Sequence, residues 1–332
     1  MKLARVAESR SKDDATGHDH ANLPIPTDQR AGRMKTILVT GGGRGLGRGV
    51  AERLAADGHR VVLTVRDSSG PRVVAEILRT TPSAKVEHRT LNLASFASIR
   101  SFARDLPHDL RFDVVLHVAG ILQQSRVRRT TSDGFEETLA VNALAPFLLT
   151  HELLPRIGTG QGPGRVICVS SRLHLPGSRG VPVDYDFSDP SLERGYHPDR
   201  AYKGSKLALL WVAFELARRI PPSQFTVHGM CPGFVPETAA ASTKGLMRLF
   251  MRFVLPHMPF ATRLLAAIDA IRFVAVDPSL DASTGGFWAD KKPFDPSRQS
   301  RSLEDGKRFW EWAESVTGTG PWPANGNGNG PP

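Results

Sequence analysis

The sequence predicts a doubly wound α/β fold: a mostly parallel sheet of about seven strands with helices on both faces. Two observations predict it. Short, continuous apolar runs alternate along the chain with helix-like segments, a pattern typical of strands that are buried on both faces. The chain also has 332 residues, 40% of them hydrophobic. It can therefore bury one large core and is too long for a small disulfide-stapled module.

The elements follow in chain order from these runs. The first strand is expected at Thr36–Thr40 and the first helix at Gly45–Asp57. Pro71 begins the second helix, where its missing N–H is harmless. Asp133 and Glu136 have the spacing of a capping box for a long helix that reaches about residue 156. Further strands are expected at 61–65, 86–91, 112–118, 165–170, 225–231 and 286–289, and further helices at 71–80, 95–104 and 199–219.

The composition predicts one domain, at 34–317, because neither an internal repeat nor a linker divides it. Residues 1–33 are polar and are expected to form a disordered leader, and 318–332, with Asn-Gly repeats and prolines, a flexible tail. No apolar run approaches the roughly 18 residues of a membrane span, and no secretory segment is evident, so a cytoplasmic location is expected. Cys168 and Cys231 lie in apolar strands, where reduced thiols are expected.

The formal net charge is +10, of which residues 1–33 carry only +1. The excess on the folded part favours anionic ligands or surfaces, but it is not by itself a nucleic-acid signature. We therefore expect no nucleic-acid partner. The histidines and cysteines do not have metal-site spacing, so no metal is expected. A homo-oligomer remains open.

A glycine-rich turn lies between the first strand and the first helix, with the sequence Thr40-Gly41-Gly42-Gly43-Arg44-Gly45-Leu46-Gly47. Glycines permit a tight turn and the close approach of a pyrophosphate, whose charge faces the helix N-terminus. An ordinary tight turn is the alternative interpretation.

Tyr202 and Lys206 are four residues apart and share a helix face. A nearby ammonium stabilises a phenolate, so we expect Lys206 to lower the pKa of Tyr202 and make it a usable acid/base.

Ser170 and Ser171 end the fifth strand, at the edge of an α/β sheet where ligands bind. A surface Tyr/Lys pair and a turn serine are the alternatives that do not involve catalysis.

The TGxxxGxG spacing, the Tyr202/Lys206 pair and Ser171 make the chain resemble the short-chain dehydrogenase/reductase family over residues 35 to about 317. The retinol-dehydrogenase-like branch is the most similar, since the 172–200 stretch looks like the insertion of that branch. The resemblance implies a Rossmann-type fold and a nicotinamide cofactor.

It also implies four catalytic roles. Tyr202 would be the general acid/base, and Lys206 would tune it and bind the nicotinamide ribose. Ser171 would orient the substrate carbonyl, and Asn142 would hold a water of the proton relay, with a buried structural amide as the alternative for Asn142. Besides Tyr202 and Lys206, the implied cofactor-binding residues are Gly41, Gly43, Arg44, Gly45, Leu46, Gly47, Arg66, Asn92, Leu93, Ala119, Gly120, Pro232, Gly233 and Val235.

The second strand favours NADP(H) over NAD(H). Val65 stands where an acidic residue would bind a ribose 2′-hydroxyl, and Arg66 follows it. With Arg44, two guanidiniums are available for a 2′-phosphate. Asp67, directly after Arg66, argues against this preference.

Three features of the sequence depart from the family pattern. His117-Val118-Ala119-Gly120 replaces Asn-Asn-Ala-Gly after the fourth strand, and we expect His117 to be structural and to replace a lost sheet-locking hydrogen bond. Asn92 replaces an aspartate near the adenine and is expected to accept from its amino group. Thr238 arrives one position late for a phosphate contact.

The segment 239–260 is expected to form a basic amphipathic substrate lid, with Lys244, Arg248 and Arg252 in one stripe. A peripheral membrane contact and a partner interface are the alternatives. Arg126, Arg128 and Arg129 either rim the same mouth or form a solvated loop, and His174 and His197 lie in the insertion, within possible reach of substrate.

Together these features predict an NADP(H)-dependent oxidoreductase that interconverts a ketone or aldehyde and its alcohol on a bulky lipophilic substrate. An epimerase or cyclase on the same scaffold is one alternative. An NADP(H)-sensing interaction module is the other, although such a module has no need of a tuned phenol.

Overall fold

The computed structural model describes residues 33–158, 162–176, 180–239, 254–255, 258, 261–320 and 322. Within these residues one eight-stranded sheet has the order β3-β2-β1-β4-β5-β6-β7-β8. All neighbouring strands are parallel except β7 and β8. The strands are β1 (Thr36–Val39), β2 (Arg60–Val65), β3 (Lys85–Thr90), β4 (Val114–His117), β5 (Gly164–Val169), β6 (Phe225–Cys231), β7 (Gly286–Ala289) and β8 (Lys292–Pro293).

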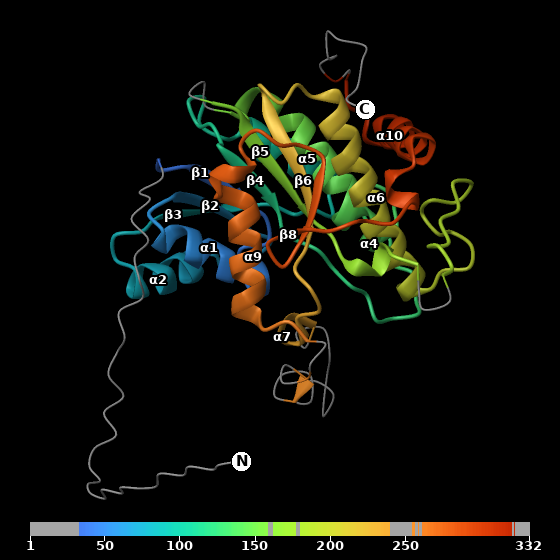
Figure 1. Ribbon diagram of the computed structural model, residues 1–332, viewed down its shortest axis with the longest axis horizontal. Helices are drawn as coiled ribbons and strands as arrows, with labels where there is room; N and C mark the ends of the chain where they lie inside the picture. The colour runs from blue at the N-terminus through green and yellow to red at the C-terminus, as the bar shows by residue number, and fades with distance from the viewer. Residues whose placement is uncertain are drawn as a thin grey trace, which may run out of the picture. The chain divides into compact units, whose positions relative to one another are not determined.

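Helices cover both faces of the sheet (Figure 1). On one face lie α1 (Gly45–Ala56), α2 (Gly70–Thr80) and α9 (Leu264–Val276). On the other lie α3 (Phe96–Arg104), α5 (Ala145–Leu153), α6 (Pro198–Arg219) and α10 (Leu303–Thr317). Successive residues of a strand face opposite sides of the sheet. Ile37 and Val39 pack in the core beneath α1, α2 and α9, whereas Leu38 packs in the core beneath α3, α5, α6 and α10. The predicted doubly wound sheet is confirmed, with the short β8 as an additional strand.

The long helix predicted from about residue 133 to 156 begins differently from expectation. Asp133 does not cap it, because Asp133 Oδ2 accepts from the main-chain N–H of Phe96, 2.9 Å away. Glu136 is itself the cap, and its carboxylate accepts from the N–H groups of Thr138 and Leu139. The helix then runs through α4 (Glu137–Leu139), a π-helical turn (Ala140–Leu144) and α5.

The packed part of the chain extends beyond the predicted end at 317. Gly318 ends α10 in the left-handed conformation (φ 60°). Trp322 then packs against Phe147, His151 and Trp310, with ring centroids 4.7–5.2 Å apart. At Trp322 the structure therefore differs from the flexible tail expected at 318–332, and beyond the described residues that tail stays a prediction. The expected leader, apart from Arg33, and nearly all of the expected lid at 239–260 lie outside the described residues.

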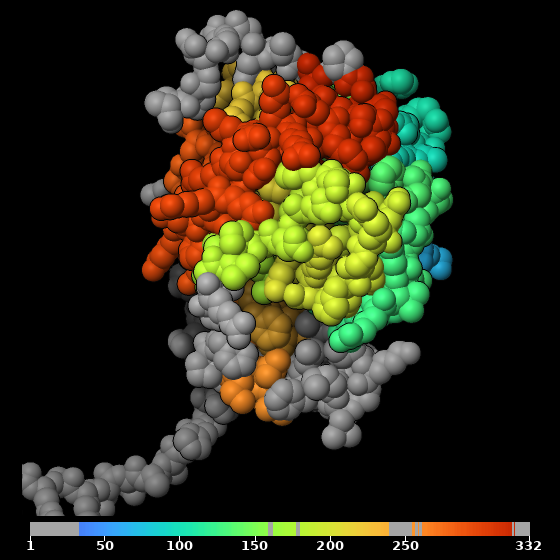
Figure 2. Space-filling model, turned by 90° about the vertical axis from the view of Figure 1, so that its right-hand side faces the viewer, coloured from blue at the N-terminus to red at the C-terminus, as the bar shows by residue number. Residues whose placement is uncertain are grey.

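The insertion after β5 is tied to its surroundings on two sides. Arg128 donates to the main-chain oxygen and the hydroxyl of Ser191, at 3.1 Å each. Gln299 exchanges two hydrogen bonds with the main chain of Val183. In Figure 2 this yellow-green segment accordingly lies between the red C-terminal part and the sea-green loop after β4. Among the described residues, no helix has the length and apolarity that crossing a membrane requires.

Candidate active site

The carboxyl edge of the sheet, where the parallel strands end, collects nearly all the predicted site residues. The glycine turn follows β1, Arg66 follows β2, Asn92 follows β3 and Gly120 follows β4. Ser171 follows β5 and the Pro232-Gly233 turn follows β6, while Tyr202 and Lys206 come from α6. The order of the strands reverses between β1 and β4, which is where open α/β sheets bind ligands.

The glycine turn has a backbone that residues with a side chain could hardly adopt. Gly41 and Gly45 have φ of +71° and +57°, which disfavour other residues. A Cβ on Gly47 would lie 2.3 Å from the Gly41 carbonyl oxygen, so only glycine allows α1 to start this close to β1. Arg44 is the exposed residue at the cap of α1, and its side chain does not bond to the helix end. The turn thus leaves the helix N-terminus open to an anion.

Thr40, the first residue of the glycine motif, had no role assigned from the sequence, and it holds the turn to the neighbouring strand by hydrogen bonds. Its hydroxyl accepts from the N–H groups of Val118 and Ala119 at 3.0 and 3.1 Å and bonds to Leu116 O at 3.2 Å. A β-strand threonine directly before the glycines was the available signal. The sheet-locking bond expected of His117 is therefore made by Thr40.

His117 has a different structural partner. Its Nε2 lies 2.8 Å from Thr150 Oγ1, whose own hydroxyl donates to Pro146 O. Nε2 therefore carries the proton and donates. Burial lowers the pKa of His117 to about 3, which keeps the ring neutral. The expectation that His117 is structural is consistent with this environment.

Asn142 lies within the π-helical turn and is fully buried. Its amide exchanges two hydrogen bonds with the main chain of Ile121, at 2.8 and 2.9 Å, and donates to Ser205 Oγ at 3.0 Å. A Cβ on Gly120 would lie 3.1 Å from Lys206 Nζ and 3.3 Å from Asn142 Oδ1. Asn142 thus fixes the loop after β4 against Lys206. Ser205 is a second residue that the sequence analysis missed, although it lies inside the Tyr/Lys motif.

Lys206 is 4% exposed, and its ammonium donates to Val169 O at 2.9 Å. Burial lowers the pKa of Lys206 to about 8. Its Nζ lies 5.9 Å from the centroid of the Tyr202 ring. Ser170, at the end of β5, is bonded to the same residue: its hydroxyl donates to the main-chain oxygen of Lys206 at 2.9 Å. Ser170 thus has a structural partner on α6, and not the bond to its own turn that the alternative interpretation expected.

Tyr202 and Ser171 are brought together at this edge. Burial raises the pKa of Tyr202 above its usual value, and a hydrogen bond with the Ser171 hydroxyl opposes that rise. The sequence led us to expect a pKa lowered by Lys206, so in this structure the net direction is the reverse. Ser171 Oγ also accepts from the N–H of Leu173 at 3.2 Å, which orients its hydroxyl.

The turn after β6 borders the same site. Gly233 has φ +83°, and a Cβ there would lie 2.0 Å from Thr262 Oγ1. Val235 is buried, and its carbonyl accepts from the N–H and hydroxyl of Thr238. Thr238 lies beside the glycine turn, since a Cβ on Gly45 would be 3.4 Å from its methyl group. Thr238 lies one position later in the sequence than the family pattern has its threonine. The short helix α7 (Pro236–Ala239) nevertheless places it beside the glycine turn.

The corner after β2 and β3 holds the remaining cofactor candidates. Arg66 and Asp67 are both exposed. Asp67 Oδ1 accepts from the N–H of Ser69 at 3.0 Å, and hydrogen bonds with Ser69 lower the pKa of this carboxyl group. Asn92 Oδ1 already accepts from Ala94 N at 3.1 Å, so an adenine amino group would share that oxygen. Leu93, next to it, packs against the core of its face.

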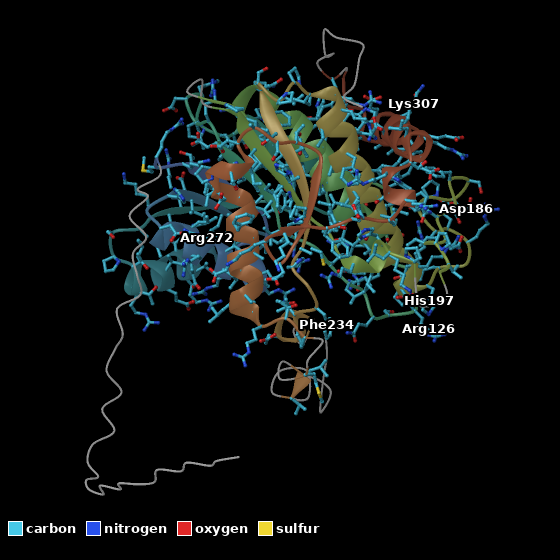
Figure 3. The ribbon with its side chains drawn as sticks, viewed as in Figure 1. Arg126, Asp186, His197, Phe234, Arg272 and Lys307 are labelled. Carbon is cyan, nitrogen blue, oxygen red and sulfur yellow. The ribbon has the colours of Figure 1, made fainter. Side chains whose placement is uncertain are left out.

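The other candidates have separate places. Arg128 donates a hydrogen bond to Ser191 of the insertion, and Arg129 forms an ion pair with Glu137 at 3.5 Å. Arg126 is exposed and His197 caps α6, and both lie at the periphery of the molecule (Figure 3). His174 is fully buried beside Ser171. Both cysteines are buried free thiols, as expected.

Comparison with known proteins gives consistent matches. The family model of the short chain dehydrogenases matches residues 35–183. Human retinol dehydrogenase 12 is 31% identical, over 93% of this chain and 92% of its own. Polyprenol dehydrogenase from Mus musculus is 32% identical, over 86% of this chain and 84% of its own. The crystal structure of an uncharacterized protein from Mycobacterium paratuberculosis superimposes with a TM-score of 0.64 at 28% identity, covering 86% of this chain and 94% of that one.

Proposed function

This chain belongs to the short-chain dehydrogenase/reductase family, a family of oxidoreductases that use nicotinamide cofactors, and from that premise we propose its specific reaction. It interconverts a ketone or aldehyde and its alcohol, with NADP(H) as cofactor and a bulky lipophilic compound as substrate. The convergence of Ser171, Tyr202 and Lys206 beside an open glycine turn carries the proposal.

The residues divide the reaction among themselves. A bound nicotinamide cofactor would supply or accept the hydride. In the reductive direction Tyr202 donates its phenolic proton to the carbonyl oxygen, and Ser171 donates a hydrogen bond to the same oxygen. The positive charge of Lys206 favours the phenolate that Tyr202 leaves behind. Because Ser171 Oγ accepts from the main-chain N–H of Leu173, the serine oxygen is already oriented before the carbonyl arrives.

The charges around the ribose position favour NADP(H). Arg44 and Arg66 are exposed cations that follow β1 and β2. Asp67 is the only nearby acid of that turn, and its carboxylate is engaged with Ser69. A 2′-phosphate would therefore meet two guanidiniums, whereas a 2′-hydroxyl would lack the usual carboxylate partner.

Apolar side chains at the same edge favour a lipophilic substrate. Leu122, Leu173 and Phe234 are 41–47% exposed and follow the adjacent strands β4, β5 and β6. Phe234 lies on this edge, near α7 (Figure 3). Exposed apolar groups gathered around a site are typical of pockets for apolar ligands. The names of the retinol and polyprenol dehydrogenases, which are similar to this chain, refer to substrates of this class.

Titration with NADPH and NADH, followed by fluorescence, tests the cofactor assignment. We expect NADPH to bind more tightly than NADH, and Arg66→Ala to weaken NADPH by about tenfold while leaving NADH nearly unchanged, because only NADPH carries the 2′-phosphate. Arg79→Ala, which removes an exposed arginine from the far end of α2, is the matched control. Equal weakening of both nucleotides by Arg66→Ala would contradict 2′-phosphate recognition.

A panel of bulky carbonyl compounds then tests the reaction. NADPH oxidation by the wild type, abolished in Tyr202→Phe with nucleotide binding retained, is the expected result. Tight NADPH binding without turnover of any carbonyl would instead favour a nucleotide-sensing module. Failure of either nucleotide to bind would remove the oxidoreductase assignment for this chain.

A further inference from the structure

The turn that follows Ser171 is held by a buried histidine. His174 ends the short 3-10 turn Arg172–His174 and is 0% exposed. Its Nδ1 forms a hydrogen bond with Ser171 O, and its main-chain N–H points to the same oxygen at 3.4 Å. Since a carbonyl oxygen only accepts, Nδ1 carries the proton. The ring stands edge-on to Phe287 of β7, with centroids 5.2 Å apart.

The other nitrogen of this ring shows why a histidine is used here. Nε2 is buried and has no partner among the described residues. Burying a polar atom without a partner costs free energy, and an apolar side chain of similar shape would avoid that cost. The bond from Nδ1 to Ser171 O is thus the interaction that distinguishes histidine from an apolar side chain at this position.

A further contact holds the same turn. The Arg172 guanidinium lies over the Phe294 ring, 4.7 Å from its centroid. In the neighbouring turn after β6, Cys231 Sγ accepts from the main-chain N–H of Gly233 at 3.4 Å.

We propose that His174 is a positioning residue of the reaction, which fixes the main chain of Ser171 so that its hydroxyl stays within reach of Tyr202 and of the substrate carbonyl. This inference rests on the proposed function, because Ser171 acts in that reaction. His174 itself does not touch the reacting atoms. Its effect passes through one carbonyl oxygen, and a displacement of Ser171 by a fraction of an ångström would weaken both hydrogen bonds of its hydroxyl.

Three variants separate positioning from packing. In His174→Asn the amide nitrogen takes the place of Nδ1 and retains the donor. In His174→Phe the ring remains but the donor is lost. His228→Phe is the matched control, because His228 is also fully buried, has an unpaired Nε2 and contacts a tryptophan in β7.

With a carbonyl compound that the wild type reduces, we expect kcat to be about tenfold lower in His174→Phe. In His174→Asn, kcat should lie within about threefold of the wild-type value. The Kd for NADPH should stay within about twofold in both. His228→Phe should lose Tm without losing kcat. Wild-type kcat in His174→Phe, or equal losses in the Asn and Phe variants, would overturn the proposal.

A readout independent of turnover keeps the two proposals distinguishable. The chain has three tyrosines, so their ring carbons can be followed by NMR with ¹³C-labelled tyrosine, and Tyr202→Phe assigns the Tyr202 signal. Because the Ser171 bond lowers the pKa of Tyr202, we expect its titration midpoint to rise by about 0.5 pH unit in His174→Phe but not in His174→Asn or His228→Phe. An unchanged midpoint in His174→Phe would overturn the positioning role even if no carbonyl substrate were turned over.

Discussion

Lys206 holds a positive charge in a place where burial disfavours it. Its main-chain partner Val169 O satisfies one ammonium proton, but the surrounding core lowers the pKa of this lysine from 10.5 to about 8. The free energy of unfolding is reduced by this burial at neutral pH, and the proposed benefit is a cation 5.9 Å from the centroid of the Tyr202 ring. Stability and the proposed chemistry therefore make opposite demands on one residue.

This conflict predicts a pH dependence. Between about pH 8 and 10.5 the unfolded chain binds more protons at Lys206 than the folded chain, so the contribution of this group to stability rises with pH across that window. Below pH 8 the cost is fully present. Relative to Lys206→Met, the wild type should gain up to about 1.4 kcal/mol per pH unit over this window.

Urea unfolding of both proteins at pH 7, 8, 9 and 10 measures the difference, and groups that titrate in both proteins cancel. Lys203→Met controls for removing a lysine from the same helix, where its ammonium pairs with Asp199 at 2.7 Å. A constant difference between wild type and Lys206→Met from pH 7 to 10 would contradict the burial of a charged lysine.

At the scale of elements, the π-helical turn is the feature that builds the site. It inserts one wide turn between α4 and α5, and Asn142 within it reaches the main chain of Ile121. Turns of this kind occur often at functional sites. In the sequence this region has the continuous apolar character of an ordinary helix, so the helix could be predicted but the wider turn could not.

Asn142→Ala should lower the free energy of unfolding by about 2–3 kcal/mol, because it removes three hydrogen bonds and leaves the polar groups of Ile121 without their partner. It should also lower kcat, since the loop beside Lys206 loses its anchor. Thr150→Val is the control: Thr150 lies on α5, and the change breaks its buried bond to His117 of β4 at a cost of about 1 kcal/mol, with kcat retained. Chemical denaturation and steady-state kinetics measure both effects. Equal kcat in Asn142→Ala and wild type would leave Asn142 with the structural role alone.

Strand positions show how far sequence patterns extend. The runs around β1, β2, β5, β6 and β7 are apolar because both faces of the sheet are covered, and the six parallel strand neighbours follow from that. Contacts between distant residues did not follow. The threonine lock at Thr40 and the bond between Asn142 and Ser205 depend on which loops meet at the carboxyl edge, and a single sequence does not contain that information.

At the scale of the whole molecule, the end of the folded part is set by packing and not by composition. Residues after 317 are rich in glycine and proline, which predicted a tail. A single tryptophan changes this outcome: Trp322 is 9% exposed and packs with Phe147 and Trp310 in the core between α5 and α10. One large aromatic ring buries much apolar surface, which accounts for the packed position of Trp322.

Trp322→Ala should therefore destabilise the protein by about 3 kcal/mol, since it removes a buried ring from contact with Phe147, His151 and Trp310. Trp322→Phe should recover at least half of this loss, because the ring packing persists and the indole Nε1, which has no partner among the described residues, is removed. Leu303→Ala, at a position 65% exposed on α10, should change stability by less than about 0.5 kcal/mol. Urea midpoints at constant m-value measure all three, and NADPH binding should be unaffected because the carboxyl edge carries none of these residues. If the midpoint of Trp322→Ala equalled that of Leu303→Ala, the C-terminal segment would not belong to the cooperative core.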